Sequence, residues 1–494
     1  MAQNGSTPNL SQLPPEMLDF AILKSGGALA PRLGRLSLQG RKTILTPAFI
    51  GNTSRGVIPH ISQDNYRKCG VDGVYIPLED FIEKYPNKTP PVFQLETPEP
   101  LRAFTALPND SLVVLGPRRN PPILTPNGHT NTEISLLTSV GFKMVSSEYY
   151  AAAARKLQPD IVVGLADIPF GKEKVSIKRK DKMSDRTEVW LRDIIAKQNT
   201  VEANERKFNI FAPMLPIERD LQSWYLEHLL DDMVDKISGV AIYDAYLLDD
   251  LPDELHHLPR LSFHDPASPQ DVLRQIGMGM DLFTIPFITT ATDAGIALSF
   301  TFPPPSEKPQ DDVRQALGVD MWHADLAQSV TPLSEDCACY ACTKHHRAYI
   351  QHLLSAKEML GWVLIQIHNH AVLNTFFSSI RASIERGTFD ADVAAFTAFY
   401  EPQLPEKTGQ GPRVRGYQFN SNELAREGRK NPKAYKKFDE EKIVQLRAAH
   451  GQLVGKKPEV RDVIDDEALV GLVGMGNEDV DVRLEGLEIE DTKT

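Results

Sequence analysis

Three cysteines lie within six positions of the chain, and a histidine follows them in the next long stretch of apolar periodicity. They are Cys337, Cys339 and Cys342, in a C-x-C-x-x-C arrangement, with His368 downstream. Three thiolates and one imidazole complete a tetrahedral zinc shell and leave no position open for water. The remaining cysteine, Cys69, is distant in sequence. The pattern therefore predicts one structural Zn²⁺ per chain rather than a disulfide framework.

The fourth ligand is the least constrained member of this set. Four other histidines lie in the same region and compete with His368, namely His345, His346, His352 and His370. The apolar spacing of residues 347–380 predicts helix, and one unbroken helix would carry His368 away from the cysteines. We therefore expect either two helices here or one helix against which the cysteine loop folds.

The composition is that of a soluble globular chain with one large or two medium domains. The chain has 494 residues, of which 41% are hydrophobic and 24% charged. No apolar run approaches the roughly 18 residues that span a bilayer, so no integral membrane segment is expected. Residues 456–494 hold twelve Asp or Glu and five Lys or Arg, and thus contribute −7 of the net charge of −12. Because the rest is only mildly acidic, the total charge does not exclude a nucleic-acid partner.

Short apolar runs alternate with amphipathic stretches through the middle of the chain. This alternation predicts an α/β fold with a parallel sheet, and the number of units favours a closed (β/α)8 barrel over an open doubly wound sheet. The expected strands are 111–116, 122–125, 161–167, 208–215, 239–243, 258–264, 281–286 and 295–300. The expected helices are 131–141, 147–156, 184–197, 223–237 and 268–278, the last with Ser268 as its N-cap.

Four parts are expected along the chain. Residues 1–105 are turn-rich and predict a β-rich lead-in, and residues 106–330 predict the barrel body. Residues 331–400 predict a zinc-binding subdomain with a long helix. Residues 401–494 predict a linker and an acidic C-terminal tail, partly disordered because like charges are many and aromatic residues sparse.

The residues around the cysteines closely resemble the zinc segment of tRNA-guanine transglycosylases. The most specific matches are Cys337–Leu354, Ala356–Leu360 and Ile367–His370, while the matches over the rest of 20–390 are weaker one by one. The resemblance implies a TIM barrel with a zinc subdomain attached late in the chain, and it assigns the fourth ligand to His368. In that family the zinc subdomain and its long helix form the dimer, which implies a partner surface within 340–380.

Positions that carry catalysis in this family differ here. The nucleophile of the catalytic members is an aspartate, and the matching position is Thr284, whose hydroxyl cannot replace an ionised carboxylate. Their base-proximal aspartate is matched by Pro126, which has no proton to exchange. Asp281 precedes the nucleophile position, and Asp167 is either a remnant of the purine pocket or a turn residue. The resemblance thus implies a vestigial pocket and no catalytic residue.

A retained scaffold with missing catalytic groups is similar to the family's non-catalytic chains. This resemblance implies a heterodimer with a catalytic queuine tRNA-ribosyltransferase subunit that exchanges guanine for queuine at the anticodon wobble position of tRNA. It implies a cytoplasmic protein, with peripheral association with the mitochondrial outer membrane left open. One alternative is an active transglycosylase that uses Asp281 or Asp167. Another is a zinc-dependent TIM-barrel hydrolase, although catalytic zinc needs an open position that four protein ligands do not leave.

A basic run lies between a predicted strand end and a predicted helix. Its candidate tRNA contacts are Lys178, Arg179, Lys180 and Lys182. Such residues neutralise phosphates and give affinity that depends on salt and not on sequence. The plainer interpretation is a solvated loop.

Overall fold

The computed structural model describes residues 17–123, 128–170, 175–199, 207–306 and 313–412. All of them belong to one compact unit, residues 1–428. Pro126, most of the expected linker and the whole acidic tail lie outside the described residues.

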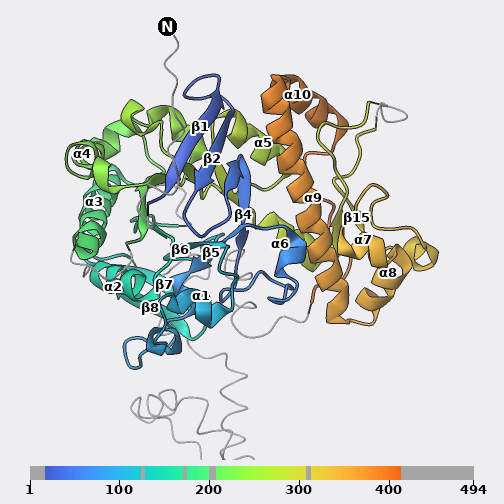
Figure 1. The fold of residues 1–494 in the computed structure, drawn as a ribbon, viewed down its shortest axis with the longest axis horizontal. Coiled ribbons are helices and arrows are strands. Elements are labelled where there is room, and N and C mark those ends of the chain that lie inside the picture. The colour runs from blue at the N-terminus through green and yellow to red at the C-terminus, as the bar shows by residue number, and fades with distance from the viewer. Residues whose placement is uncertain (1–16, 124–127, 171–174, 200–206, 307–312, 413–494) are drawn as a thin grey trace, which may run out of the picture. The chain divides into compact units, whose positions relative to one another are not determined.

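Eight parallel strands close into a barrel in the order β4-β5-β6-β9-β10-β11-β12-β13. The predicted (β/α)8 barrel is confirmed, and the open doubly wound sheet is wrong. The barrel strands are β4 Ala48–Asn52, β5 Gly73–Pro77, β6 Leu112–Gly116, β9 Ile161–Val163, β10 Asn209–Met214, β11 Gly239–Ile242, β12 Arg260–Ser262 and β13 Leu282–Thr284. Figure 1 shows helices around the outside of this barrel.

The barrel strands are apolar on both faces because one face lines the interior and the other packs under helices. Alternate residues point inward, and together they fill the barrel with side chains. The interior cluster contains Ile50, Tyr75, Leu112, Val114, Ile161, Val163, Phe211, Ala241, Leu261 and Leu282. The barrel is therefore a packed core, and any ligand site must lie at one of its ends.

The helices between the strands are α1 Pro100–Thr105, α2 Ser147–Leu157, α3 Ile177–Asn199, α4 Ser223–His228, α5 Pro269–Gly277 and α6 Phe287–Ala294. The predicted cap of α5 is confirmed, because the Asp271 N–H donates to Ser268 Oγ at 3.3 Å. The predicted helix over 223–237 is α-helical only as far as His228 and continues as a π turn and a 3₁₀ turn.

Residues 1–105 contribute more than a lead-in, so the predicted barrel boundary at residue 106 is wrong. Strands β4 and β5 both come from this segment; they are short apolar runs that the surrounding turn residues obscure. Before them, β1 Asp19–Ser25, β2 Arg32–Ser37 and β3 Ile44–Thr46 form an antiparallel sheet. Leu36 and Ile44 of this sheet join the interior cluster, so the sheet closes the amino-terminal end of the barrel.

Three predicted elements differ from the structure. The helix expected over 131–141 is the start of a hairpin, β7 Glu133–Thr138 with β8 Gly141–Ser146, and Gly141 at φ +120° supplies a backbone conformation that favours glycine. No strand forms at 122–123, and 124–125 lie outside the described residues. The run 295–300 contains β14 Ile296–Leu298, which pairs antiparallel with β15 Gly318–Asp320 and takes no part in the barrel.

A second core cluster forms beside the barrel. Its helices are α7 Tyr340–Lys344, α8 Arg347–Ser355 and the start of α9 Met359–Arg386. The later turns of α9 and α10 Phe389–Phe399 pack instead in the larger apolar cluster around the outside of the barrel. The expectation of two helices over 347–380 is confirmed, because the helical conformation is interrupted between α8 and α9, where Lys357 has φ +58°. The cluster includes Ala297 and Met321, so this part begins at β14 and not at residue 331 as predicted. Within the described ranges, no helix is both long and apolar enough to cross a bilayer, even α9 with its 28 residues.

Candidate zinc centre and barrel-end pocket

Cys337, Cys339, Cys342 and His368 come together where α7 meets α9. Their donor atoms all lie within 4.8 Å of one another. The three Sγ atoms lie 3.6, 3.7 and 3.3 Å from His368 Nδ1. Zn–S bonds of about 2.3 Å and a Zn–N bond of about 2.0 Å at tetrahedral angles give edges of about 3.6 Å. The four donors therefore fit a tetrahedral zinc ion.

Local hydrogen bonds orient these ligands. Cys339 caps the amino end of α7, where its Sγ accepts the Cys342 N–H at 3.4 Å and so turns Cys342 back toward it. His368 Nε2 donates to the Leu298 carbonyl at 2.8 Å, which leaves Nδ1 to face the thiols. Metal-bound histidines usually have such a second partner, which fixes the ring and its tautomer.

The competing histidines are not part of the cluster. Among the described residues, the group able to hold a metal contains His368 and none of His345, His346, His352 or His370. His370 Nδ1 instead bonds to the Gln366 carbonyl at 3.0 Å. The structure thus selects His368 as the fourth donor.

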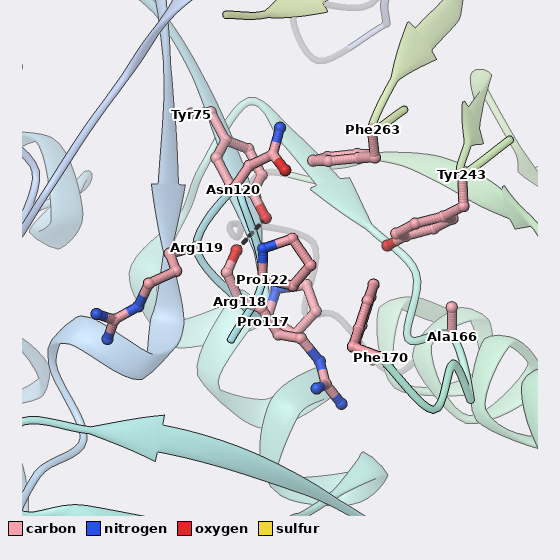
Figure 2. Close-up of a pocket in the computed structure, with 10 residues that line it drawn as sticks. All are labelled: Tyr75, Pro117, Arg118, Arg119, Asn120, Pro122, Ala166, Phe170, Tyr243 and Phe263. Carbon is pink, nitrogen blue, oxygen red and sulfur yellow. Dashed lines mark hydrogen bonds between the residues drawn. The ribbon is translucent and has the colours of Figure 1, made fainter. Parts of the chain in front are cut away.

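A pocket opens at the carboxyl ends of the barrel strands, where TIM-barrel enzymes have their active sites (Figure 2). It is lined by Tyr75, Pro117, Arg118, Arg119, Asn120, Pro122, Ala166, Phe170, Tyr243 and Phe263. The rings of Tyr243 and Phe263 stack at a centroid distance of 5.2 Å, and Tyr75 meets Phe263 edge-on at 5.2 Å. The Tyr75 hydroxyl donates to the Arg118 carbonyl at 2.5 Å and holds the chain after β6. Four of the ten lining residues are therefore aromatic, and two are arginines.

Thr284, the residue expected at the nucleophile position, lies fully buried at the end of β13. Its Oγ1 accepts a hydrogen bond from Asn120 Nδ2 at 2.6 Å. The backbone carbonyl of Asn120 in turn accepts a hydrogen bond from Asn52 Nδ2. The hydroxyl is thus part of a polar network and has no neighbouring base in that network to activate it.

Asp167 is enclosed by three side chains. It bonds to His129 Nδ1 at 2.6 Å, to Arg179 Nη1 at 2.6 Å and to Arg186 Nη1 at 3.1 Å. Burial favours its neutral form, but the bonds from His129 and Arg179 outweigh burial and lower the pKa of Asp167 to about 2. Both oxygens of the ionised carboxylate are occupied, so Asp167 is neither an open purine acceptor nor a simple turn residue.

Asp281 lies just before β13, at the opposite end of the barrel. It is fully buried, accepts from Arg32 Nε at 2.9 Å and accepts from the Arg260 backbone N–H at 2.8 Å. A carboxylate enclosed in this way, away from the pocket, cannot attack a ribose at the other end. The alternative with Asp281 as nucleophile is therefore wrong.

The basic run is mostly not a loop. Residues 171–174 lie outside the described residues, and 177–182 form the first turns of α3. Arg179 is bound to Asp167, and Lys180 Nζ pairs with Glu218 Oε2 at 2.8 Å. Lys178 and Lys182 are exposed. Of the four candidate tRNA contacts, these two remain the best placed.

Several residues of the pocket were missed in the sequence. Arg118 lies two positions after a predicted strand, Tyr243 ends another, and Phe263 lies within a third. Because barrel ligands bind at carboxyl strand ends, this position alone could have identified them. His129 and Arg186 carry no such signal, since their role depends on Asp167, which lies 38 and 19 positions away.

Comparison with known proteins agrees with this geometry. Residues 28–402 match the family model for queuine tRNA-ribosyltransferase, a range that includes the barrel and all four zinc donors. The chain belongs to the queuine tRNA-ribosyltransferase family.

Three relatives within this family are named queuine tRNA-ribosyltransferase accessory subunit 2. The protein of Schizosaccharomyces pombe is 34% identical over 384 residues, which covers 77% of this chain and 84% of the relative. Its counterpart in Drosophila persimilis is 29% identical over 372 residues, which covers 72% of this chain and 86% of the relative. The protein of Xenopus tropicalis is 27% identical over 407 residues, which covers 73% of this chain and 95% of the relative.

Proposed function

We propose that the chain is a non-catalytic accessory subunit of a heterodimeric queuine tRNA-ribosyltransferase, which exchanges guanine for queuine at the wobble position of tRNA. The observation that carries this proposal is the state of the pocket. Thr284 offers a hydrogen-bonded hydroxyl where the catalytic members have a carboxylate nucleophile, and Asp167 is saturated by its own chain. The names of the relatives support the same role.

In this proposal, zinc serves assembly. Cys337, Cys339, Cys342 and His368 would hold one Zn²⁺, whose bonds order the surrounding segment. Four apolar or aromatic side chains nearby on α7, α8 and the start of α9 are unusually exposed: Tyr340 by 39%, Tyr349 by 37%, Met359 by 49% and Leu360 by 43%. Exposed apolar groups of this kind mark interaction surfaces, and we assign this one to the catalytic subunit.

Base exchange tests the proposal directly. Labelled guanine or queuine is offered with tRNA to this chain alone, to a catalytic subunit alone and to both together. We expect incorporation only when the catalytic subunit is present, with the highest rate for the pair, because this chain has no ionised nucleophile at position 284. Incorporation by this chain alone would refute the proposal.

Salt dependence tests the tRNA contacts. Replacing Lys178 and Lys182 by glutamine in the heterodimer should reduce the slope of log affinity against log salt by about 0.7–0.9 for each lysine that meets a phosphate. The matched control is Lys156→Gln, which removes an exposed charge from the last turn of α2, before the amino end of β9. A double variant with the slope of the control would exclude these lysines from the tRNA interface.

A further inference from the structure

The amino-terminal end of the barrel contains a buried guanidinium, that of Arg260, and among the described residues one of its edges has no hydrogen-bond partner. We propose that this edge, formed by Nε and Nη2, binds a small monovalent inorganic anion, with chloride as the representative. The inference goes beyond the proposed accessory role and does not depend on it. It rests on the unused donors of Arg260, on the charges around them and on the way in which Arg32 uses the same edge.

The unused donors belong to a side chain that is held in place. Arg260 is the first residue of β12 and is fully buried. Its Nη1 donates to the Ala28 carbonyl at 3.0 Å and to the Gly279 carbonyl at 3.1 Å. Nε and Nη2 are buried too, but neither has a partner in the part of the chain that the structure describes. Buried donors without a partner cost free energy, most of all on a charged group, so this edge favours a ligand.

Arg32 shows what this edge of a guanidinium binds. It donates through Nε to Asp281 Oδ1 at 2.9 Å and through Nη2 to Asp281 Oδ2, so the edge holds both oxygens of a carboxylate. Paired donors of this kind favour anions, because charge-assisted hydrogen bonds are about twice as strong as neutral ones. Arg260 has the same pair of donors, but Asp281 bonds to its backbone N–H, at 2.8 Å, and leaves the side-chain edge unused.

The charges at this end of the barrel do not sum to zero. Arg32, Arg260 and Asp281 are 2%, 0% and 0% exposed. Burial lowers the pKa of Arg260 to about 10, so its guanidinium stays protonated near neutral pH, and within the described residues the charges that act on it are those of Arg32 and Asp281. Burial also raises the pKa of Asp281, so two guanidinium groups face at most one negative charge. A monovalent anion compensates this buried excess.

The position of the edge limits the ligand and gives it a structural role. Ala28 lies in the turn between β1 and β2, and Arg32 begins β2. Arg260 and Asp281 belong to the barrel, at the end opposite to the pocket. Because the donor atoms are enclosed, a small ion fits and a large organic anion does not. We expect the bound anion to stabilise the contact between the amino-terminal sheet and the barrel.

Thermal unfolding of the full zinc-loaded chain tests the inference. Chloride is varied at constant ionic strength against gluconate, an anion too large for an enclosed site. We expect the melting temperature to rise by about 2 °C for each tenfold increase in chloride above its dissociation constant. Arg260→Met should abolish this rise, whereas the matched control Arg67→Met, at a guanidinium that is 61% exposed, should keep it. A wild-type melting temperature that does not depend on chloride, or an equal dependence in Arg260→Met, would overturn the inference.

A second measurement does not depend on how the variant folds. Crystals of the wild-type chain are soaked in bromide, whose anomalous scattering identifies the ion. We expect a bromide peak within hydrogen-bond distance of both Nε and Nη2 of Arg260. A water molecule on this edge at saturating bromide, or bromide at surface positions alone, which is an adventitious ion only, would contradict the anion site.

Discussion

Replacing Cys339 by serine should remove zinc from the chain and abolish binding of the catalytic subunit. A hydroxyl does not replace a thiolate ligand, and structural zinc sites contribute on the order of 10 kcal/mol to folding. The cluster beside the site would lose its support, because Cys339 and Cys342 are themselves packed in it with Trp362. We therefore expect the exposed apolar surface of α7, α8 and α9 to lose its arrangement.

Metal analysis, thermal unfolding and gel filtration with the catalytic subunit measure these effects. The control is Cys69→Ala, because Cys69 is fully buried away from the cluster and burial raises the pKa of its thiol to about 12. This variant should lose some packing but keep one zinc and the partner. A Cys339→Ser chain that retained both would show that the site is not structural.

Replacing Asp281 by asparagine should destabilise the chain by about 3–5 kcal/mol, because breaking a buried ion pair leaves an uncompensated charge. Arg32 and Asp281 are 2% and 0% exposed, and they join the amino-terminal sheet to the barrel. Asparagine keeps one acceptor oxygen, so it can serve either Arg32 or the backbone N–H of the fully buried Arg260 but not both. The expected effect is large because Arg32, Arg260 and Asp281 are all buried.

Urea unfolding measures this loss. Asp325→Asn is the control, since Asp325 is 87% exposed and its partner His323 is exposed too, so its substitution should cost less than about 0.5 kcal/mol. If Asp281→Asn were as stable as this control yet the heterodimer lost base exchange, a chemical role for Asp281 would have to be reconsidered.

The sequence predicted the barrel because six of its strands are short apolar runs between amphipathic segments. It did not predict that β4 and β5 belong to the barrel, since each lies among turn residues and no long helix separates them. Nor did it predict the hairpin at β7 and β8, because Ile134, Leu136 and Leu137 fit helical spacing as well as a strand. The spacing of apolar residues identifies a segment that must be buried, but whether it becomes a helix or a strand depends on the segments that pack against it.

The zinc donors were predictable because three of them are adjacent in sequence and their chemistry is specific. The ion pair of Arg179 was not predictable, because a guanidinium on a helix can either be exposed to solvent or bind a carboxylate on another segment. In the structure it binds Asp167, 12 positions earlier. One contact therefore changed the interpretation of two predicted sites at once.

Helix α9 spans roughly 42 Å at 1.5 Å per residue, and it is anchored along its length. In its first half, His368 bonds to the Leu298 carbonyl. Near its end, Arg381 Nη1 donates to the Pro47 carbonyl at 2.8 Å, and Lys24 Nζ donates to the Glu385 carbonyl at 2.6 Å. The same helix thus contributes to the proposed docking surface and is bonded to segments next to the barrel strands. We expect a chain with a misfolded barrel to be unable to present that surface, so that assembly itself acts as quality control and only well-folded copies are retained in the complex.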